Sequence, residues 1–209
     1  MKNIIFIISL FFIGQNLVGQ GKNKSKIPSV LDHTNKFDGF FDFNYDEKND
    51  IIYLTVKQLN KEFLYINSLS SGVGNNDIGL DRGQLGNERI VYFSKSGNKL
   101  LLIQPNLRYR SSSDNSLEQR SIEEAFAKSV LFGFPILENN NNGYIIDLTP
   151  FLMQDTHGVK KRLSDLGEGD FEIDSLRSAV NLSRTKAFPN NVEFDMMLTY
   201  EGTNPGFLV

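Results

Sequence analysis

Residues 70–89 read SSGVGNNDIGLDRGQLGNER and join two runs that are typical of β-strands. Connections in compact domains are usually about 4–6 residues long, so this one is unusually long. Its glycines permit positive φ angles and close backbone contacts. Ile78, Leu80 and Leu85 add apolar side chains that a solvated linker would not need. The stretch, here called the Gly/Asp/Arg loop, is therefore predicted to be ordered and to pack against the rest of the domain.

Polar side chains of this loop, and of an extended arm further along the chain, are the candidate docking or binding residues. They are Asn76, Asp77, Asp81, Arg82, Arg108 and Arg110. A pair of carboxylates at Asp77 and Asp81 would suit glycoside hydrolysis, but that chemistry depends on a separation that the sequence does not define. In the purely structural interpretation, Asp77, Asp81 and Arg82 bind the loop backbone and one another.

The runs on both sides of the loop predict a strand-rich domain. Residues 40–45 and 51–56 flank a polar turn, and residues 89–94 and 100–103 flank a Gly-Asn dipeptide, so each pair has a hairpin signature. Further strands are expected at residues 62–69, 130–137, 144–148, 171–174, 179–182 and 192–200.

Two short helices are indicated by their start signals. Ser121 and Glu124 have capping-box spacing, which predicts a helix that begins at Ser121 or as early as Ser116. Thr149 and Pro150 have the pattern of an N-cap followed by the first helical residue.

A third helix is indicated by apolar periodicity. Val159, Leu163 and Leu166 share one face at helical spacing, with a cap expected at Asp155 or the threonine after it, and Gly167 provides a C-terminal stop. Together these patterns predict an α+β fold, mainly antiparallel β-sheet with a few short helices.

The first residues predict export. Residues 1–19 have the layout of a secretory signal peptide, with a basic start at Lys2 and an apolar run over residues 4–13. That run is shorter than the roughly 20 residues that span a bilayer, so no membrane span is expected after cleavage. The alternative is an N-terminal core helix. Residues 20–36 are polar and are expected to form a flexible tether, which leaves a domain at residues 37–209 and a periplasmic, outer-surface or secreted location.

Composition excludes several classes of partner and site. The 209 residues suffice for a domain with a substantial core. A net charge of −3 provides no electrostatic footprint for nucleic acid. The chain has no cysteine, which excludes disulfides, zinc-thiolate sites and thiol nucleophiles. Seventeen phenylalanines and no tryptophan predict a core of phenylalanine, leucine and isoleucine.

Motifs for metals and nucleotides are incomplete in this sequence. His157 is not followed by the glutamate and second histidine of a zincin helix. Gly74 and Gly79 have phosphate-loop spacing, but Leu80 follows in place of the lysine. The loop alternates Asn and Asp as an EF-hand does, yet Gly86 stands where the bidentate glutamate belongs. We therefore expect no metal ion or other cofactor bound by this chain alone.

Three phrases carry a resemblance to a known family. They are NDIGLDRGQ at residues 76–84, QPNLRYR at residues 104–110, and RSA with RTKAFP at residues 177–189. These phrases are similar to the N-terminal region of large secreted bacterial zinc-dependent metallopeptidases, and the similarity covers residues 37–209. The resemblance implies an export signal, a β-rich domain of uncharacterised role, and a later catalytic domain whose His-Glu-x-x-His helix binds zinc.

On this resemblance we expect the chain to be a fragment: the non-catalytic N-terminal domain of an exported metallopeptidase. Its partner would be the downstream peptidase domain of the same protein, on which it packs and whose cleft it shapes. The apolar ending at residues 206–209 is consistent with a chain that continues. Two alternatives remain open at this point. One is an autonomous binding module for carbohydrate or surface polymer, and the other is a hydrolase that uses Asp77 and Asp81.

Overall fold

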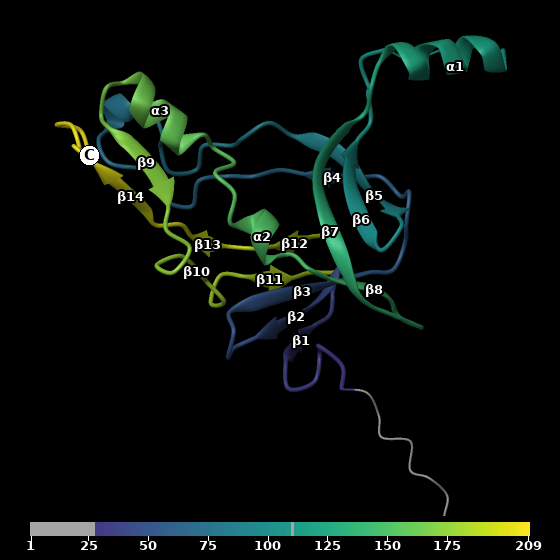
Figure 1. Ribbon diagram of the computed structural model, residues 1–209, viewed down its shortest axis with the longest axis horizontal. Helices are drawn as coiled ribbons and strands as arrows, with labels where there is room; N and C mark the ends of the chain where they lie inside the picture. Colours follow the sequence, from purple (N-terminus) through teal and green to yellow (C-terminus); the bar gives the residue numbers. More distant parts are fainter. Residues whose placement is uncertain (1–27, 110) are drawn as a thin grey trace, which may run out of the picture.

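A computed structural model describes residues 28–109 and 111–209 (Figure 1). The predicted signal peptide, residues 20–27 of the predicted tether, and Arg110 lie outside the described residues. Within the part that the structure describes, no helix combines the length and the apolar character needed to cross a membrane.

One antiparallel sheet of eight strands forms the body of the molecule. Its order is β1-β2-β3-β8-β7-β6-β5-β4. The strands are β1 (Asn35–Phe37), β2 (Asp42–Asp46), β3 (Ile51–Val56), β4 (Phe63–Tyr65), β5 (Arg89–Ser96), β6 (Lys99–Gln104), β7 (Ser129–Asn140) and β8 (Gly143–Asp147). The prediction of a mainly antiparallel sheet is confirmed, and so are both hairpins that flank the Gly/Asp/Arg loop.

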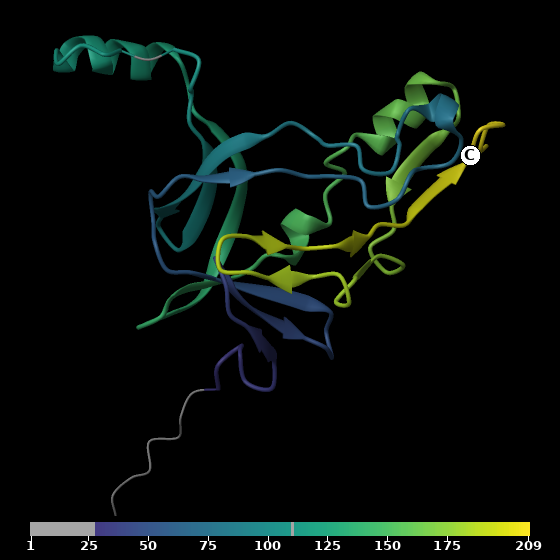
Figure 2. The same cartoon turned by 180° about the vertical axis from the view of Figure 1, so that it is seen from behind.

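The sheet is strongly curved, and β3 runs roughly across the direction of β7 (Figures 1 and 2). Two irregularities on β7 explain the curvature. Its pairing with β6 shifts register beside Leu102, and its pairing with β8 shifts after Ile136. Bulges of this kind bend a strand and increase its twist. The bent β7 thus joins the two halves of the sheet around a common core.

Phenylalanines fill the concave side of this sheet, as the composition predicts. Phe134 on β7 is fully buried, and its ring centroid lies 5.9 Å from that of Phe93 on β5. The ring centroid of Phe41, which follows β1, lies 5.0 Å from that of Phe63 on β4. Because β1 and β4 are the two edge strands, this contact draws the ends of the sheet toward each other.

A second, irregular antiparallel ladder runs from one end of the molecule to the sheet. It pairs β9 (Asp170–Ile173) with β14 (Tyr200–Thr203), β10 (Ala179–Val180) with β13 (Met196–Met197), and β11 (Lys186–Ala187) with β12 (Val192–Glu193).

The prediction of one continuous strand over residues 192–200 is wrong. The backbone N–H of Asp195 donates to the hydroxyl of Thr185 at 3.1 Å, and the N–H of Thr199 donates to the hydroxyl of Ser178 at 2.9 Å. Because these two N–H groups bind side chains rather than partner-strand carbonyls, the regular ladder is interrupted between β12, β13 and β14.

The capping residues of two helices differ from those expected. Helix α1 (Ser116–Ala125) begins at the earlier of the two predicted positions, and Asn115, not Ser121, caps it through a side-chain oxygen that accepts from the N–H of Leu117. In α2 (Thr149–Leu152) the N-cap is Leu148. The hydroxyl of Thr149 instead accepts a hydrogen bond from the backbone N–H of Ile52 on β3.

Helix α3 (Val159–Asp165) is defined at both ends largely as predicted. The N-cap residue is Gly158, so the cap predicted at Asp155 or the threonine after it is misplaced. The Asp155 carboxylate nevertheless accepts from the N–H groups of Val159 and Lys160 at 2.8 and 2.9 Å and so satisfies the first donors of the helix. Gly167 adopts φ 73° beyond the last turn and ends the helix. Leu166 does not share the buried face, because its side chain is 37% exposed.

Candidate functional site

The Gly/Asp/Arg loop is anchored at the α3 end of the molecule. Ile78 and Leu80 are buried against Val159 and Leu163 of α3, in a hydrophobic cluster separate from the core of the sheet. The guanidinium of Arg162 donates to the backbone carbonyl of Ile78. The prediction of an ordered, packed loop is therefore confirmed for its first two apolar side chains, whereas that for Leu85 is wrong, because Leu85 is 64% exposed.

Backbone hydrogen bonds fold the loop back on itself. The N–H of Val73 donates to the carbonyl of Leu80 at 2.9 Å, and the N–H of Gly83 donates to the carbonyl of Leu69 at 2.8 Å. A short 3-10 helix forms the tip and ends at Gly79, whose φ of 72° favours a residue without a side chain. The tip thus has a defined shape before any ligand or partner is present.

The four candidate residues on the loop lie at its surface. Asn76, Asp77, Asp81 and Arg82 are all exposed. In the described part of the chain, the side chains of Asp77, Asp81 and Arg82 make no hydrogen bond or ion pair. The structural interpretation of these three side chains is therefore wrong, because other groups stabilise the loop.

Those stabilising groups were missed at the sequence level. The amide oxygen of Asn75 accepts from the N–H of Asp77 at 3.0 Å, and that of Gln84 accepts from the N–H of Asp81 at 3.2 Å. Asn75 directly precedes the 3-10 helix and occupies its N-cap position, where asparagine is a preferred residue. Of these two stabilising roles, that of Asn75 could therefore have been recognised from the sequence.

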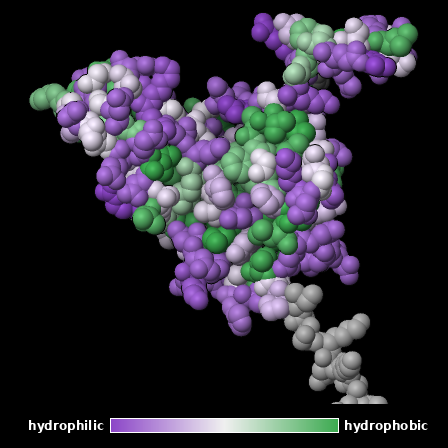
Figure 3. Space-filling view, in the orientation of Figure 1, coloured by the Kyte–Doolittle hydropathy of each residue, from purple (hydrophilic) through white to green (hydrophobic). Residues whose placement is uncertain are grey.

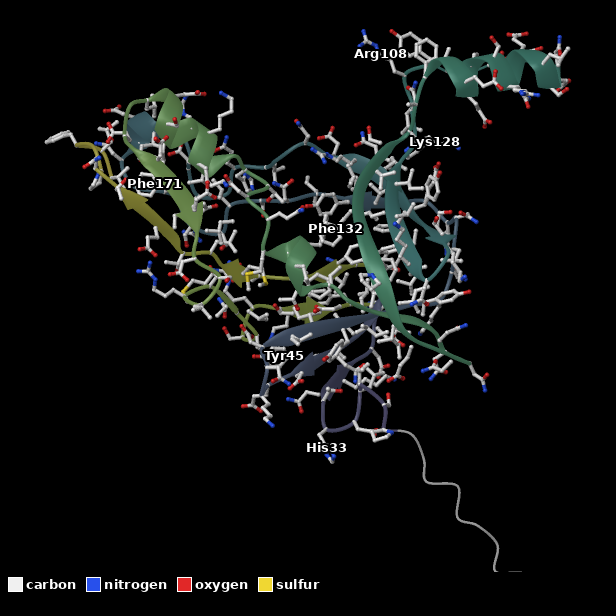
Figure 4. All side chains as sticks on the ribbon, in the orientation of Figure 1. His33, Tyr45, Arg108, Lys128, Phe132 and Phe171 are labelled. Carbon is white, nitrogen blue, oxygen red and sulfur yellow. The ribbon has the colours of Figure 1, made fainter. Side chains whose placement is uncertain are left out.

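Arg108 belongs to a different part of the molecule. It lies on the arm between β6 and β7 that carries α1, with its guanidinium carbon 5.7 Å from the ring centre of Tyr109. Tyr109 in turn stacks on Phe126 with 4.0 Å between ring centroids. Figure 4 shows Arg108 at the base of α1, on the other side of the molecule from α3 and the loop. The predicted residues therefore do not form one site, and Arg110 lies outside the described residues.

A polar pocket of about 510 Å³ lies between the sheet and α3, and sequence reasoning did not identify it. Its lining comes from β4 and the residues just after it, from β5, from the connection between α2 and α3 together with the start of α3, and from β9. The lining residues are Tyr65, Asn67, Arg89, Gln154, Asp155, Thr156, Lys160 and Ile173. Side chains alternate between the two faces along β5, so Arg89 is on the same face as the inward-facing Val91 and Phe93. A charged residue at an inward-facing position is the sequence signal that could have revealed the pocket.

Side-chain contacts hold the walls of this pocket in place. The amide nitrogen of Asn67 lies 3.0 Å from Nε2 of His157, which links the sheet side to the α2–α3 connection. The hydroxyl of Tyr200 donates to the Asp155 carboxylate at 3.0 Å. Burial, together with the negative charge and hydrogen bond of Asp155, raises the pKa of the Tyr200 phenol well above its ordinary value.

Alkaline pH is expected to destabilise the folded chain, and Tyr200→Phe is expected to weaken that dependence. The unfolded chain loses the Tyr200 proton near the ordinary pKa of 10.0, while the folded chain retains it. The stability that this tyrosine contributes is therefore complete below its unfolded pKa and is lost as pH rises above it. Urea denaturation at several values between about pH 8 and pH 11 measures the slope. Tyr109→Phe, on the exposed arm, is the control, and an identical slope in Tyr200→Phe and the parent chain would contradict the prediction.

In residues 28–109 and 111–209, no three or more histidine, aspartate or glutamate side chains are grouped so as to hold a metal ion.

Hydrophilic and apolar side chains alternate over much of the surface, with local differences between its parts. Figure 3 shows that the end of the molecule with α3 is largely hydrophilic, whereas apolar side chains gather over β7. Val130 and Leu137 on β7 are 57% and 43% exposed.

Comparison with known proteins gives one match. The sequence profile of a family described as Domain of unknown function (DUF5117) matches residues 83–206, more than half of the chain. The matched range begins inside the Gly/Asp/Arg loop and contains β5–β8, the second ladder, and helices α1, α2 and α3. No curated protein and no solved structure matches the chain.

Proposed function

The chain belongs to the family described as Domain of unknown function (DUF5117), and on that premise we propose that it is a non-catalytic docking domain of an exported zinc-dependent metallopeptidase. The peptidase link is supported by the resemblance of residues 76–84, 104–110 and 177–189 to the N-terminal region of such enzymes. In this proposal the domain is the predicted α+β unit of residues 37–209 together with the start of β1 at Asn35, and a signal peptide at residues 1–19 directs its export.

The observation that carries the docking role is the preformed tip of the Gly/Asp/Arg loop. Ile78 and Leu80 fix the loop from beneath, while Asp77, Asp81 and Arg82 project from it. A surface whose backbone is already ordered loses less conformational entropy on association than a flexible one. In addition, the charged groups of the tip make no hydrogen bond within the described part of the chain that a partner would have to break.

The partner in this proposal is the downstream peptidase domain of the same protein. The loop tip contacts that domain and forms part of one wall of its substrate cleft. Zinc would be held by a His-Glu-x-x-His helix of the peptidase domain, and no residue of this chain is assigned as a ligand.

The two alternative functions receive less support from the geometry. Asp77 and Asp81 lie on the exposed loop and do not line the pocket beside α3, so a hydrolase built on them has no enclosed substrate site there. A carbohydrate module needs exposed aromatic platforms grouped on one surface, whereas Phe43, Phe93 and Phe134 are buried in the core. The exposed Tyr109 and Phe188 lie on separate parts of the chain, the arm that carries α1 and the tip of the second ladder.

The test uses the longer protein with its peptidase domain. Asp81→Ala and Arg82→Ala are each expected to lower kcat/KM for a peptide substrate about tenfold, which corresponds to about 1.4 kcal/mol of lost transition-state stabilisation. The fold should be preserved because both side chains are exposed and neither is bonded within the described part of the chain. Thermal denaturation checks this.

Arg120→Ala is the matched control, because Arg120 is also an exposed arginine but lies on α1, where it pairs with Glu124. Full activity in both loop variants would overturn the docking role of the loop.

A further inference from the structure

We propose that the pocket between the sheet and α3 binds the terminal carboxylate of a peptide, with Arg89 as the principal contact. This site is separate from the exposed loop tip to which the docking role is assigned. It is built from side chains that the docking proposal does not use.

Strand pairing places Arg89 on the core side of the sheet, at the edge of the apolar core. Arg89 on β5 is directly opposite Tyr65 on β4, and directly opposed residues of an antiparallel pair project from the same face of the sheet. The Tyr65 ring lies 5.5 Å from the ring of Phe151 on α2, which identifies this face as the core side. Arg89 is therefore directed to the point where the apolar core ends and the polar pocket begins.

Several donors in the pocket are not engaged. In the described part of the chain, the side chains of Arg89, Gln154 and Thr156 have no hydrogen-bond or ion-pair partner, yet all three line the same hollow. Lys160 adds an ammonium group. One of its three N–H donors is engaged by Glu172, at 2.5 Å, and two remain.

The only acidic side chain of the lining is already bonded. One oxygen of Asp155 accepts from the N–H of Val159 and the hydroxyl of Tyr200, and the other accepts from the N–H of Lys160. Asp155 therefore has little capacity left to engage Arg89 or a ligand. The pocket lining has two basic side chains, Arg89 and Lys160, against the one bonded carboxylate of Asp155, and this excess of positive charge favours an anionic ligand.

The shape of the donors favours a carboxylate. The planar guanidinium of arginine matches the two oxygens of a carboxylate in a bidentate contact. The hydroxyl of Thr156 and the amide of Gln154 can bind the backbone polar groups next to that carboxylate. Ile173 and the ring of Tyr65 offer an apolar wall for the last side chain. The volume of about 510 Å³ lies within the range of small-ligand sites and accommodates the end of a peptide rather than a folded partner.

The experiment is a titration of the purified protein, followed by calorimetry and by amide chemical shifts. The probe is an acetylated tripeptide of two alanines and a C-terminal leucine with a free carboxylate, and its twin carries a C-terminal amide. We expect the free acid to bind at least ten times more tightly than the amide. Arg89→Gln should weaken binding of the acid at least tenfold. Arg89→Lys keeps the charge without the planar fork, so its affinity for the acid should lie between those of the parent and Arg89→Gln.

Arg82→Gln is the matched control, because it removes an exposed arginine outside the pocket, and binding should stay at the parental level. If Arg89→Gln proves unfolded by circular dichroism, Thr156→Val provides a second variant of the same pocket, with an expected loss of about threefold. Equal affinity for acid and amide, unchanged binding in the variants, or equal occupancy by inorganic phosphate at the same residues would each overturn the assignment. No peptidase domain takes part in this titration, so its failure leaves the docking proposal standing.

Discussion

Phe134→Ala is expected to lower the free energy of unfolding by about 3–5 kcal/mol, as large-to-small substitutions of buried aromatic residues do. The Phe134 ring is fully buried, and its centroid lies 4.7 Å from that of Phe132 and 5.9 Å from that of Phe151 on α2. It thus connects β7, the strand that bends the sheet, to the helix that closes the core. Urea denaturation followed by circular dichroism measures the loss.

The size of this effect follows from the cavity that the substitution leaves. The neighbouring rings belong to different strands and to α2, so they cannot all move into the vacated volume. Because whole domains are stable by only about 5–15 kcal/mol, the variant should be close to its unfolding threshold at room temperature.

Phe188→Ala provides the control, because it removes the same atoms from a residue that is 42% exposed at the tip of the second ladder. Its cost should be below about 1 kcal/mol. A Phe134→Ala chain with a denaturation midpoint equal to that of the parent would show that the core is not organised around this ring.

The local sequence pattern was sufficient to predict those elements whose conformation depends on their own residues. The β-branched and aromatic run at Ile51–Val56 is a strand because its side chains suit a pleated surface that is buried on both faces. The turn at Gly97 forms because a glycine accepts its φ of 58° without strain. For the same reason Gly167 ends α3 where the sequence predicts.

Contacts between distant residues decided the rest. That β3 lies beside β8, while β4 forms the opposite edge of the sheet, depends on the bending of β7 and not on either strand's own composition. Residues 192–200 read as one strand, but buried hydroxyls on Ser178 and Thr185 take two of the backbone donors. No periodicity within residues 192–200 encodes those two partners.

The candidate site divides in the same way. The apolar residues Ile78 and Leu80 indicated an ordered loop, because apolar side chains are uncommon in a solvated linker. Their partners on α3 lie about 80 residues further along the chain and could not be inferred from the loop. The pocket around Arg89 forms where four separate segments of the chain converge, so the inward phase of Arg89 was the one sign of it in the sequence.

Leu163→Ala is expected to release the Gly/Asp/Arg loop while the core of the sheet stays folded. Leu163 is 2% exposed, and only four buried residues make up the cluster that holds the loop on α3. Truncation of a buried leucine costs about 2–5 kcal/mol, and a small satellite cluster has few other contacts to offset that loss. The free energy of local opening should therefore fall at this end of the molecule.

Trypsin cleavage after Arg82 is the readout, because this arginine is exposed and its susceptibility depends on how often the loop leaves its folded shape. Cleavage should be at least about tenfold faster in Leu163→Ala, which corresponds to about 1.4 kcal/mol of easier opening when cleavage follows the open population. Amide exchange of β6 and β7 should remain slow, since their side chains pack in the separate core of the sheet.

Leu166→Ala is the matched control on the same helix, because its side chain is 37% exposed and makes no part of the buried cluster. Its cleavage rate should equal that of the parent. If both leucine variants were cleaved at the parental rate, the loop would not depend on α3 for its shape. The packing of Ile78 and Leu80 against Leu163 would then not be what orders the tip. The argument for a preformed docking surface, which depends on that packing, would fail.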